Sequence, residues 1–318
     1  MIGKILLSVL IVFLIFLAII VTRAIRFKPL NNVKLLNENV EFDGEKAISN
    51  LKRLIQFKTI SYKDKSLEDD SEFDNFIKEL PKLYPNVYKT CDLITLEDRA
   101  LLFKWKGKNS LNPAVLMAHY DVVPVNKDMW SVDPFEGVIK DGALWGRGSL
   151  DTKVTFNGAL FSAEHLITQG FIPNSDVYFA FSGGEEVNGK GALNIVNYFK
   201  DNGIEPGFVL DEGGAVVEGV FPGVSKPCGL IGIAEKGMID VEYICTSNGG
   251  HASAPKPHTP VGILSKACTK IENKPFKTHL TKPVKEMFNT LGRHSTFVFR
   301  LIFANLWCFK WVDRKSVV

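Results

Sequence analysis

The chain has 318 residues with a formal net charge of +3, and its 46% hydrophobic and 23% charged residues are ordinary for a globular protein. No basic run alternates with aromatic residues, so we expect no nucleic-acid partner. The five cysteines form no CxxC pair and none lies near a histidine at zinc-finger spacing, which favours free thiols over a disulfide framework. One disulfide is the alternative if the domain faces an oxidising compartment.

The N-terminus is apolar from residue 5 to residue 21 except for Ser8, with Lys4 before it and Arg23 and Arg26 after it. Such a stretch covers about 25 Å as a helix, close to the ~30 Å hydrocarbon core of a bilayer. We predict that residues 1–26 are an uncleaved signal anchor, because the stretch is long for a signal peptide. A cleaved signal peptide, which would leave the protein secreted or lumenal, is the alternative.

A linker and two helices are expected next. Residues 27–45 are polar and mixed, as in a short stalk. Apolar residues at three- and four-residue spacing predict a helix over 47–57 and another over 73–80. Pro81 and Pro85 are expected to end the second helix.

Strands and helices then alternate. Short apolar runs such as AVLMA at 114–118 are typical of buried parallel strands, and this alternation predicts an α/β sheet covered by helices. The expected elements are strands at 100–106, 114–118, 176–181 and 208–210, with helices at 153–169 and 191–199.

The pattern of apolar and polar residues changes near Gly229, where we place a domain boundary. Residues 232–246 alternate like an exposed antiparallel strand. The apolar stretch 297–311 contains Arg300, Asn305 and Lys310, which argues against a second membrane span and for a helix of the second domain.

Candidate ligands of a metal lie just after the predicted strands. Because sites in open α/β sheets form at the carboxyl ends of the strands, these residues are expected to meet at one edge. They are His119 and Asp121 after the strand at 114–118, Glu185 and Glu186 after 176–181, and Asp211 after 208–210.

Taken singly, each residue also has a structural explanation. His119 and Asp121 lie two apart, so Asp121 can orient the imidazole, although a turn is equally consistent. Asp151 suits the N-cap of the helix at 153–169, and spacing alone favours that role. Glu185 and Glu186 raise each other's pKa unless a cation is present, yet a solvated loop would also explain them. Spacing does not decide a role for His251.

Together the motifs resemble the zinc family of aminoacylases, acetylornithine deacetylases, succinyl-diaminopimelate desuccinylases and carboxypeptidase S. The residues of these motifs are most similar to those of the carboxypeptidase S (Gly-Xaa carboxypeptidase) branch, which includes secreted N-fatty-acyl-amino-acid hydrolases. The motifs that carry the resemblance, in the family's order and spacing, are HYDVVPV at 119–125, DGALWGRGSLD at 141–151, SGGEE at 182–186, LDEGG at 210–214 and GGHASAP at 249–255.

The resemblance implies a zinc-exopeptidase-like mixed sheet flanked by helices (27–228) and an incomplete α+β lid or dimerisation domain (229–318). It also implies two zinc ions, with cobalt or manganese as possible substitutes. Asp151 would bridge the zincs, and a hydroxide between them would attack an amide carbonyl with Glu185 as general base. His119 and Asp211 would bind one zinc and Glu186 the other, Asp121 would orient His119, and His251 on the lid would contact the substrate.

The implied substrates are peptides or N-acyl amino acids, and the implied partner is a second copy bound through the lid. Val154 stands where many relatives have glycine. The family's last zinc-ligand histidine and its substrate-carboxylate site would follow the lid, beyond Val318, so we expect a C-terminally truncated chain. His258, His279 and His294 do not match that ligand's context. The alternative is a non-catalytic remnant of the family.

Overall fold

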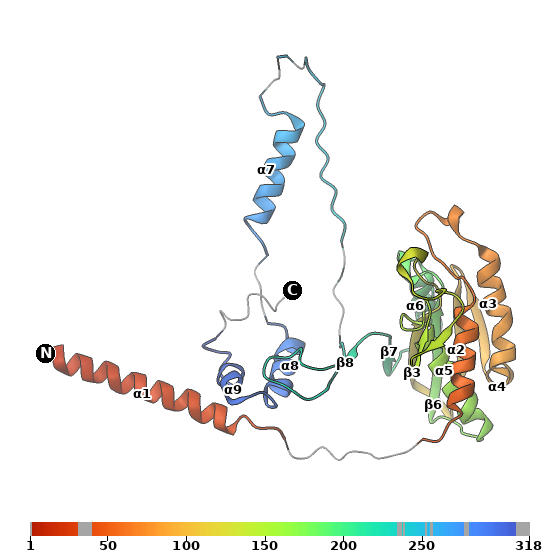
Figure 1. Ribbon diagram of the computed structural model, residues 1–318, viewed down its shortest axis with the longest axis horizontal. Helices are drawn as coiled ribbons and strands as arrows, with labels where there is room; N and C mark the ends of the chain where they lie inside the picture. Colours follow the sequence, from red (N-terminus) through yellow and green to blue (C-terminus); the bar gives the residue numbers. More distant parts are fainter. Residues whose placement is uncertain are drawn as a thin grey trace. The chain divides into compact units, whose positions relative to one another are not determined.

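The computed structural model describes residues 2–30, 40–233, 237, 239–251, 253–254, 257–276 and 280–309. The chain forms two compact units, one of residues 37–212 and one that combines residues 1–36 with 213–318 (Figure 1). The predicted domain boundary near Gly229 stays a prediction.

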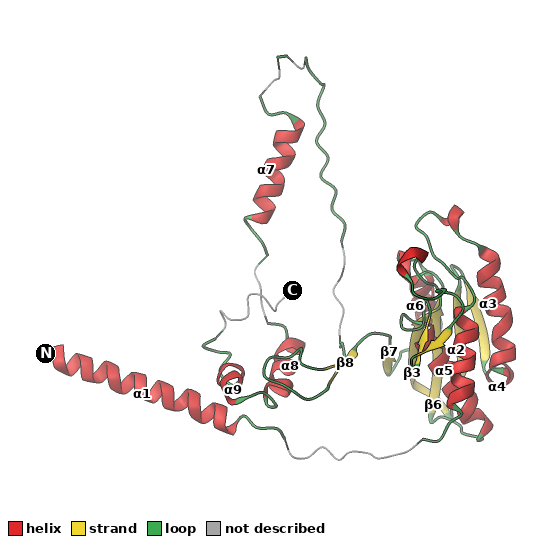
Figure 2. Ribbon diagram, in the orientation of Figure 1, coloured by secondary structure: helices red, strands yellow, loops and turns green. Residues whose placement is uncertain are grey.

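The unit of residues 37–212 combines strands with helices that pack beside them (Figure 2). Its main sheet is mixed and five-stranded, in the order β1-β2-β6-β3-β7. Strand β3 runs parallel to both β6 and β7, whereas β2 pairs antiparallel with β1 and β6. The strands are β1 (Asp92–Leu96), β2 (Ala100–Trp105), β3 (Asn109–His119), β6 (Ser175–Ser182) and β7 (Phe208–Leu210); β4 (Val138–Lys140) and β5 (Ala143–Trp145) form a separate hairpin.

Helices cover both faces of this sheet. Phe103 of β2 packs into the larger core cluster, with residues such as Phe76 and Leu160, while Leu102 packs into a second cluster with Ile195 and Phe199. This alternation follows from the two-residue period of a strand. The helices are α2 (Gly44–Ile55), α3 (Asp70–Leu83), α4 (Pro85–Thr90), α5 (Lys153–Thr168) and α6 (Gly191–Asp201).

The predicted α/β fold is confirmed, and every strand and helix predicted between residues 47 and 210 is present. Two details differ. Pro81 lies inside the last turns of α3, where its ring removes one backbone donor without ending the helix. Pro85 opens α4, a position that suits proline because the first N–H of a helix has no partner within it.

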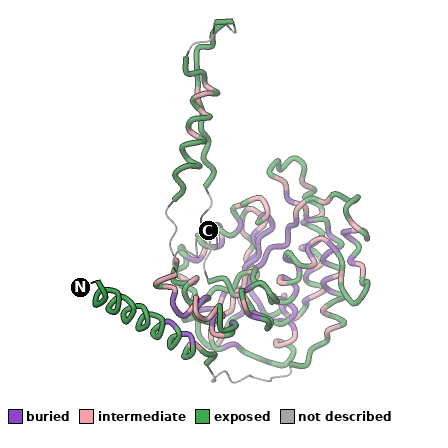
Figure 3. Tube along the Cα trace, turned by 60° about the vertical axis from the view of Figure 1, so that its left-hand side comes forward, coloured by how far each residue is buried: buried purple, intermediate pink, exposed green. Residues whose placement is uncertain are grey.

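The second unit contains α1 (Ile2–Arg26), β8 (Ala215–Val217), β9 (Cys228–Leu230), α7 (Pro260–Glu272), α8 (Lys282–Gly292) and α9 (Phe297–Phe303). Apart from Ile20 and Ala24, few residues of α1 are shielded from solvent (Figure 3). The predicted strand at 232–246 is wrong for the described residues of that range, which form no strand. An extended segment needs a neighbour to pair with, and alternation in the sequence does not supply one.

Candidate metal centre

The centre forms where three parallel strands end together. His119 is the last residue of β3 and pairs in register with Ser182, the last residue of β6. A short 3-10 helix from Glu185 to Val187 follows β6, and Glu212 follows β7 on the other side of β3. The sheet order therefore brings acidic side chains, those of Glu185 and Glu212, to the imidazole from both neighbouring strands.

The imidazole of His119 is buried, with 2% of the side chain exposed, and its Nε2 atom faces three carboxylates. The Nε2 atom lies 3.0 Å from Oδ1 of Asp151, 3.2 Å from Oε1 of Glu212 and 3.8 Å from Oε2 of Glu185. An imidazole nitrogen with several carboxylate oxygens at these distances forms a set of ligand atoms that binds divalent transition metals.

Asp151 does not cap the helix that follows it. The residue at the N-cap of α5 is Thr152, whose side chain makes no capping hydrogen bond. Instead the Asp151 carboxylate, which is largely exposed, contacts His119. The explanation of Asp151 as an N-cap is therefore wrong, because the β5–α5 turn carries its carboxylate into the centre.

Asp121 is fully buried and connects the other residues of the centre. Its carboxylate oxygens accept the backbone N–H groups of Glu185 at 3.0 Å and Glu186 at 3.1 Å. The Nδ1 atom of His119 lies 3.0 Å from the Asp121 carbonyl oxygen and 3.5 Å from its Oδ1. Asp121 thereby contacts both the imidazole and the backbone of the paired glutamates, an arrangement that is common around metal sites.

The charges of the centre shift the pKa values of its members. Burial disfavours the charged imidazole, but the hydrogen bond to Asp121 and the charges of Asp121 and Glu212 outweigh it and raise the pKa of His119 to about 10. Burial, together with repulsion between the carboxylates, raises the pKa values of Glu185, Glu186 and Glu212. A cation would relieve that repulsion.

The donor set fits a divalent cation. The ligand atoms of His119, Asp151 and Glu212 all lie within 4.8 Å of one another, and together they offer one imidazole nitrogen and two carboxylates. Such mixed nitrogen and oxygen ligation is found in zinc sites of hydrolases. The residues present can therefore hold a metal ion at the end of β3.

Glu212 is the member of this group that the sequence did not predict. The neighbouring Asp211 is exposed, and its Oδ1 accepts the backbone N–H of Glu212 at 2.8 Å. Adjacent residues of an extended segment point to opposite sides, so of two successive acids after β7 one faces the centre. The sequence analysis named Asp211, whereas the carboxylate of Glu212 is the one that lies 3.2 Å from Nε2 of His119.

His251 lies in the other unit, on a segment between β9 and α7. Its Nδ1 atom is 2.8 Å from the Ser253 hydroxyl, and the side chain is exposed. Its role in substrate contact stays a prediction.

The chain is similar to known hydrolases over most of its length. The model of peptidase family M20/M25/M40 matches residues 115–305. Probable carboxypeptidase S-like 2 of Dictyostelium discoideum is 40% identical over 82% of this chain and 51% of the relative. The N-fatty-acyl-amino acid synthase/hydrolase PM20D1 of Xenopus tropicalis is 34% identical over 87% of this chain and 55% of the relative.

The chain thus spans about half the length of the curated relatives it matches. Among solved structures, the M20 family metallo-carboxypeptidase Sso-CP2 from Sulfolobus solfataricus aligns with a TM-score of 0.44 and 21% identity, covering 56% of this chain and 39% of that one. The family match and the 40% identical relative lead to one conclusion: the chain belongs to the M20/M25/M40 peptidase family.

Proposed function

We propose that this protein hydrolyses an amide bond in a peptide or an N-acyl amino acid, with zinc as its cofactor. The observation that carries the proposal is the convergence of Asp151, Glu185 and Glu212 on the Nε2 atom of buried His119. The substrate class is inferred from relatives whose names describe carboxypeptidases and N-fatty-acyl-amino acid hydrolases. When bound, zinc acts as a Lewis acid in the hydrolysis of carbonyl compounds.

His119, Asp151 and Glu186 are proposed ligands of a two-zinc centre, as the family resemblance implies. Either Asp211 or Glu212 would complete the site at His119, and the proximity of Glu212 to Nε2 favours Glu212. His251 is proposed to contact the substrate, and the lid is proposed to mediate a homodimer.

Glu185 is the proposed general base. Its side chain is half-exposed, so water and substrate can reach it, and burial of the remainder raises its pKa toward the range in which a carboxylate exchanges protons efficiently. The hydrogen bond from its own N–H to Asp121 fixes the backbone from which this side chain extends. Glu185 would take a proton from the attacking water and deliver it to the leaving amine.

The test combines metal content with turnover. The purified chain, loaded with Zn²⁺, is assayed by elemental analysis and by release of free amino acid from N-acyl amino acids and dipeptides. Glu185→Gln is expected to abolish turnover while keeping bound zinc, because the amide cannot accept the proton. Glu45→Gln, at an exposed position of α2, is the matched control. A zinc-loaded protein without turnover, or Glu185→Gln with undiminished turnover, contradicts the proposal.

We also propose that α1 anchors the protein in a membrane. The helix has 25 residues, and an 18-residue window of it reaches a mean hydropathy of 3.3. At helical rise it measures about 37 Å, which is enough to cross the hydrocarbon core. Retention of the chain in the membrane pellet after alkaline carbonate extraction would support the anchor. Recovery of a chain that begins beyond residue 26 would support a cleaved signal peptide.

A further inference from the structure

We infer that α9 and the turn that follows it, residues 297–309, form a second membrane contact that lies in the headgroup region beside the end of α1. This inference rests on the proposed membrane insertion of α1. The partner is a bilayer surface that contains anionic lipid.

Hydrogen bonds hold this segment at a defined position along α1. The fully buried Asn305 donates from Nδ2 to the Ile20 carbonyl oxygen at 3.1 Å. Arg23 donates from Nη2 to the Ala304 carbonyl oxygen at 2.9 Å and from Nε to Oδ1 of Asn305 at 3.1 Å. Polar side chains that bridge helices in this way are common at helix contacts in membranes.

The position of these contacts sets the depth of the segment. Ile20 and Arg23 lie in the last two turns of α1, about 9 Å and 5 Å along the axis from Arg26. If α1 crosses the bilayer, this end emerges at one surface, and Ala304 and Asn305 emerge with it. Trp307 packs edge-on against Phe16 with ring centroids 5.9 Å apart. Phe16 lies about 15 Å along the axis from Arg26, so this ring reaches below the headgroups toward the acyl chains.

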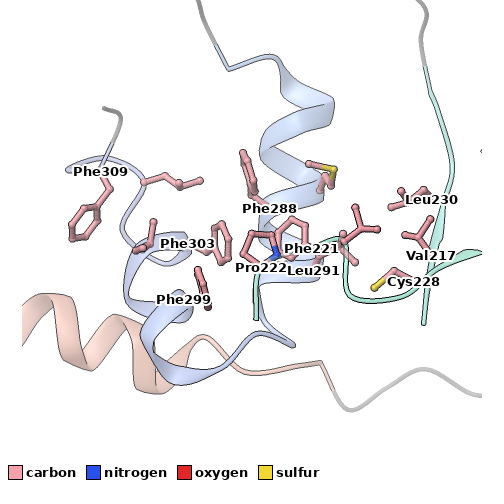
Figure 4. Close-up of a pocket in the computed structure, with 14 residues that line it drawn as sticks. Val217, Phe221, Pro222, Cys228, Leu230, Phe288, Leu291, Phe299, Phe303 and Phe309 are labelled. Carbon is pink, nitrogen blue, oxygen red and sulfur yellow. The ribbon is translucent and has the colours of Figure 1, made fainter. Parts of the chain in front are cut away.

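The surface of the segment is apolar where it is exposed. Phe297, Val298 and Trp307 are 41%, 66% and 52% exposed. The opposite side of α9 is already occupied, since Phe303 packs on Phe221 and Phe288 at centroid distances of 5.0 and 5.4 Å. These rings line an apolar cavity of about 320 Å³ between α8, α9 and the segment from β8 to β9 (Figure 4). The exposed side chains of Phe297, Val298 and Trp307 can therefore contact the apolar part of a bilayer.

The two segments that form this surface carry formal charge of one sign. Residues 20–30 and 293–309 include five cationic side chains and no aspartate or glutamate, the cations being Arg23, Arg26, Lys28, Arg293 and Arg300. Arg293 reaches the end of α1, because its Nη1 donates to the Lys28 carbonyl oxygen at 3.1 Å. An apolar patch beside clustered cations is the pattern that binds anionic bilayer surfaces.

The experiment reconstitutes the full chain in vesicles of phosphatidylcholine and phosphatidylglycerol that carry a lipid with a diazirine in its acyl chain. After irradiation, peptides are searched for covalent lipid adducts. We expect adducts on α1 and on residues 297–309, and a severalfold lower yield on the latter in phosphatidylcholine alone or at high salt. The peptide of α7 is the internal control, because Val261 and Ile271 are also exposed there.

Asn305→Leu removes the side-chain bonds to α1 and is expected to lower adduct yield on 297–309 severalfold while leaving the yield on α1 unchanged. Val298→Asp, which keeps those bonds, is expected to lower the adduct yield on residues 297–309 as well. Asn273→Leu, at the C-cap of α7, is the matched control. Adducts on α1 with none on 297–309, or equal yield on α7, would overturn this inference alone. Absence of adducts on α1 would instead overturn the proposed anchor.

Discussion

The Asp121 carboxylate accepts the backbone N–H of Glu185 at 3.0 Å, which links the end of β3 directly to the loop that carries the proposed general base. A second bond, from the N–H of Glu186, uses the other oxygen of the same carboxylate. Asp121 itself is fully buried, so its carboxylate depends on these protein donors for its hydrogen bonds.

Asp121→Asn is therefore expected to weaken zinc binding about 10- to 100-fold, the usual cost of losing a residue that supports metal ligands. The amide has one accepting oxygen, so one of the two N–H groups loses its partner and the imidazole loses a charged neighbour. Competition with a chromogenic chelator measures the affinity. Asp128→Asn, at an exposed position, is the control. Equal affinity in both variants would show that Asp121 does not organise the centre.

Glu212→Gln is expected to lower zinc affinity more than Asp211→Asn. The Glu212 carboxylate lies 3.2 Å from Nε2 of His119, whereas the Asp211 carboxylate accepts a backbone N–H of its own loop. The same chelator competition, run on both variants, measures the difference. If Asp211→Asn has the larger effect, the assignment made from the sequence is right and the loop turns its other acid inward when metal binds.

The sequence predicted the sheet unit well because its signals are local. Between residues 47 and 210, the apolar runs, glycines and helical spacing indicate which residues of each segment are buried, without information from the other segments. The position of the centre followed from the same logic, since parallel strands end at a common edge. The conformation of one short loop decides whether Asp211 or Glu212 faces the centre. Residue spacing does not indicate that conformation.

Outside the sheet, prediction failed where a segment depends on a partner distant in the chain. The alternation at 232–246 resembles a strand, but the described residues there pair with none. The contact of Asn305 with Ile20 joins residues 285 positions apart, and nothing in either local sequence indicates it. Within the sheet, the strand β1 was missed for a different reason: all its side chains are partly or fully exposed, and only the pairing with the neighbouring β2 defines it.

Glu164→Leu is expected to destabilise the sheet unit by about 2–3 kcal/mol, because buried N–H groups that lose a charged acceptor are costly. The Glu164 carboxylate on α5 accepts the N–H groups of Asn86 and Val87, both at 2.9 Å, and so binds the first turn of α4. Urea unfolding followed by circular dichroism measures the loss. Glu164→Gln keeps one accepting oxygen and should lose less. Equal stability of all three proteins would mean that α4 does not depend on this contact.

Cys268 is expected to react with iodoacetamide much faster than Cys91. Burial, with the negative charges of Asp92 and Glu164, raises the pKa of the Cys91 thiol to about 12, so hardly any thiolate forms near pH 8. The Cys91 side chain is also only 7% exposed, whereas Cys268 is exposed on α7. Timed alkylation followed by peptide mass spectrometry measures both rates. In urea the two alkylation rates should converge, because unfolding removes the burial that protects Cys91. If the Cys91 peptide is labelled as fast as the Cys268 peptide in the folded protein, the result would contradict the place of Cys91 in the core beside α5.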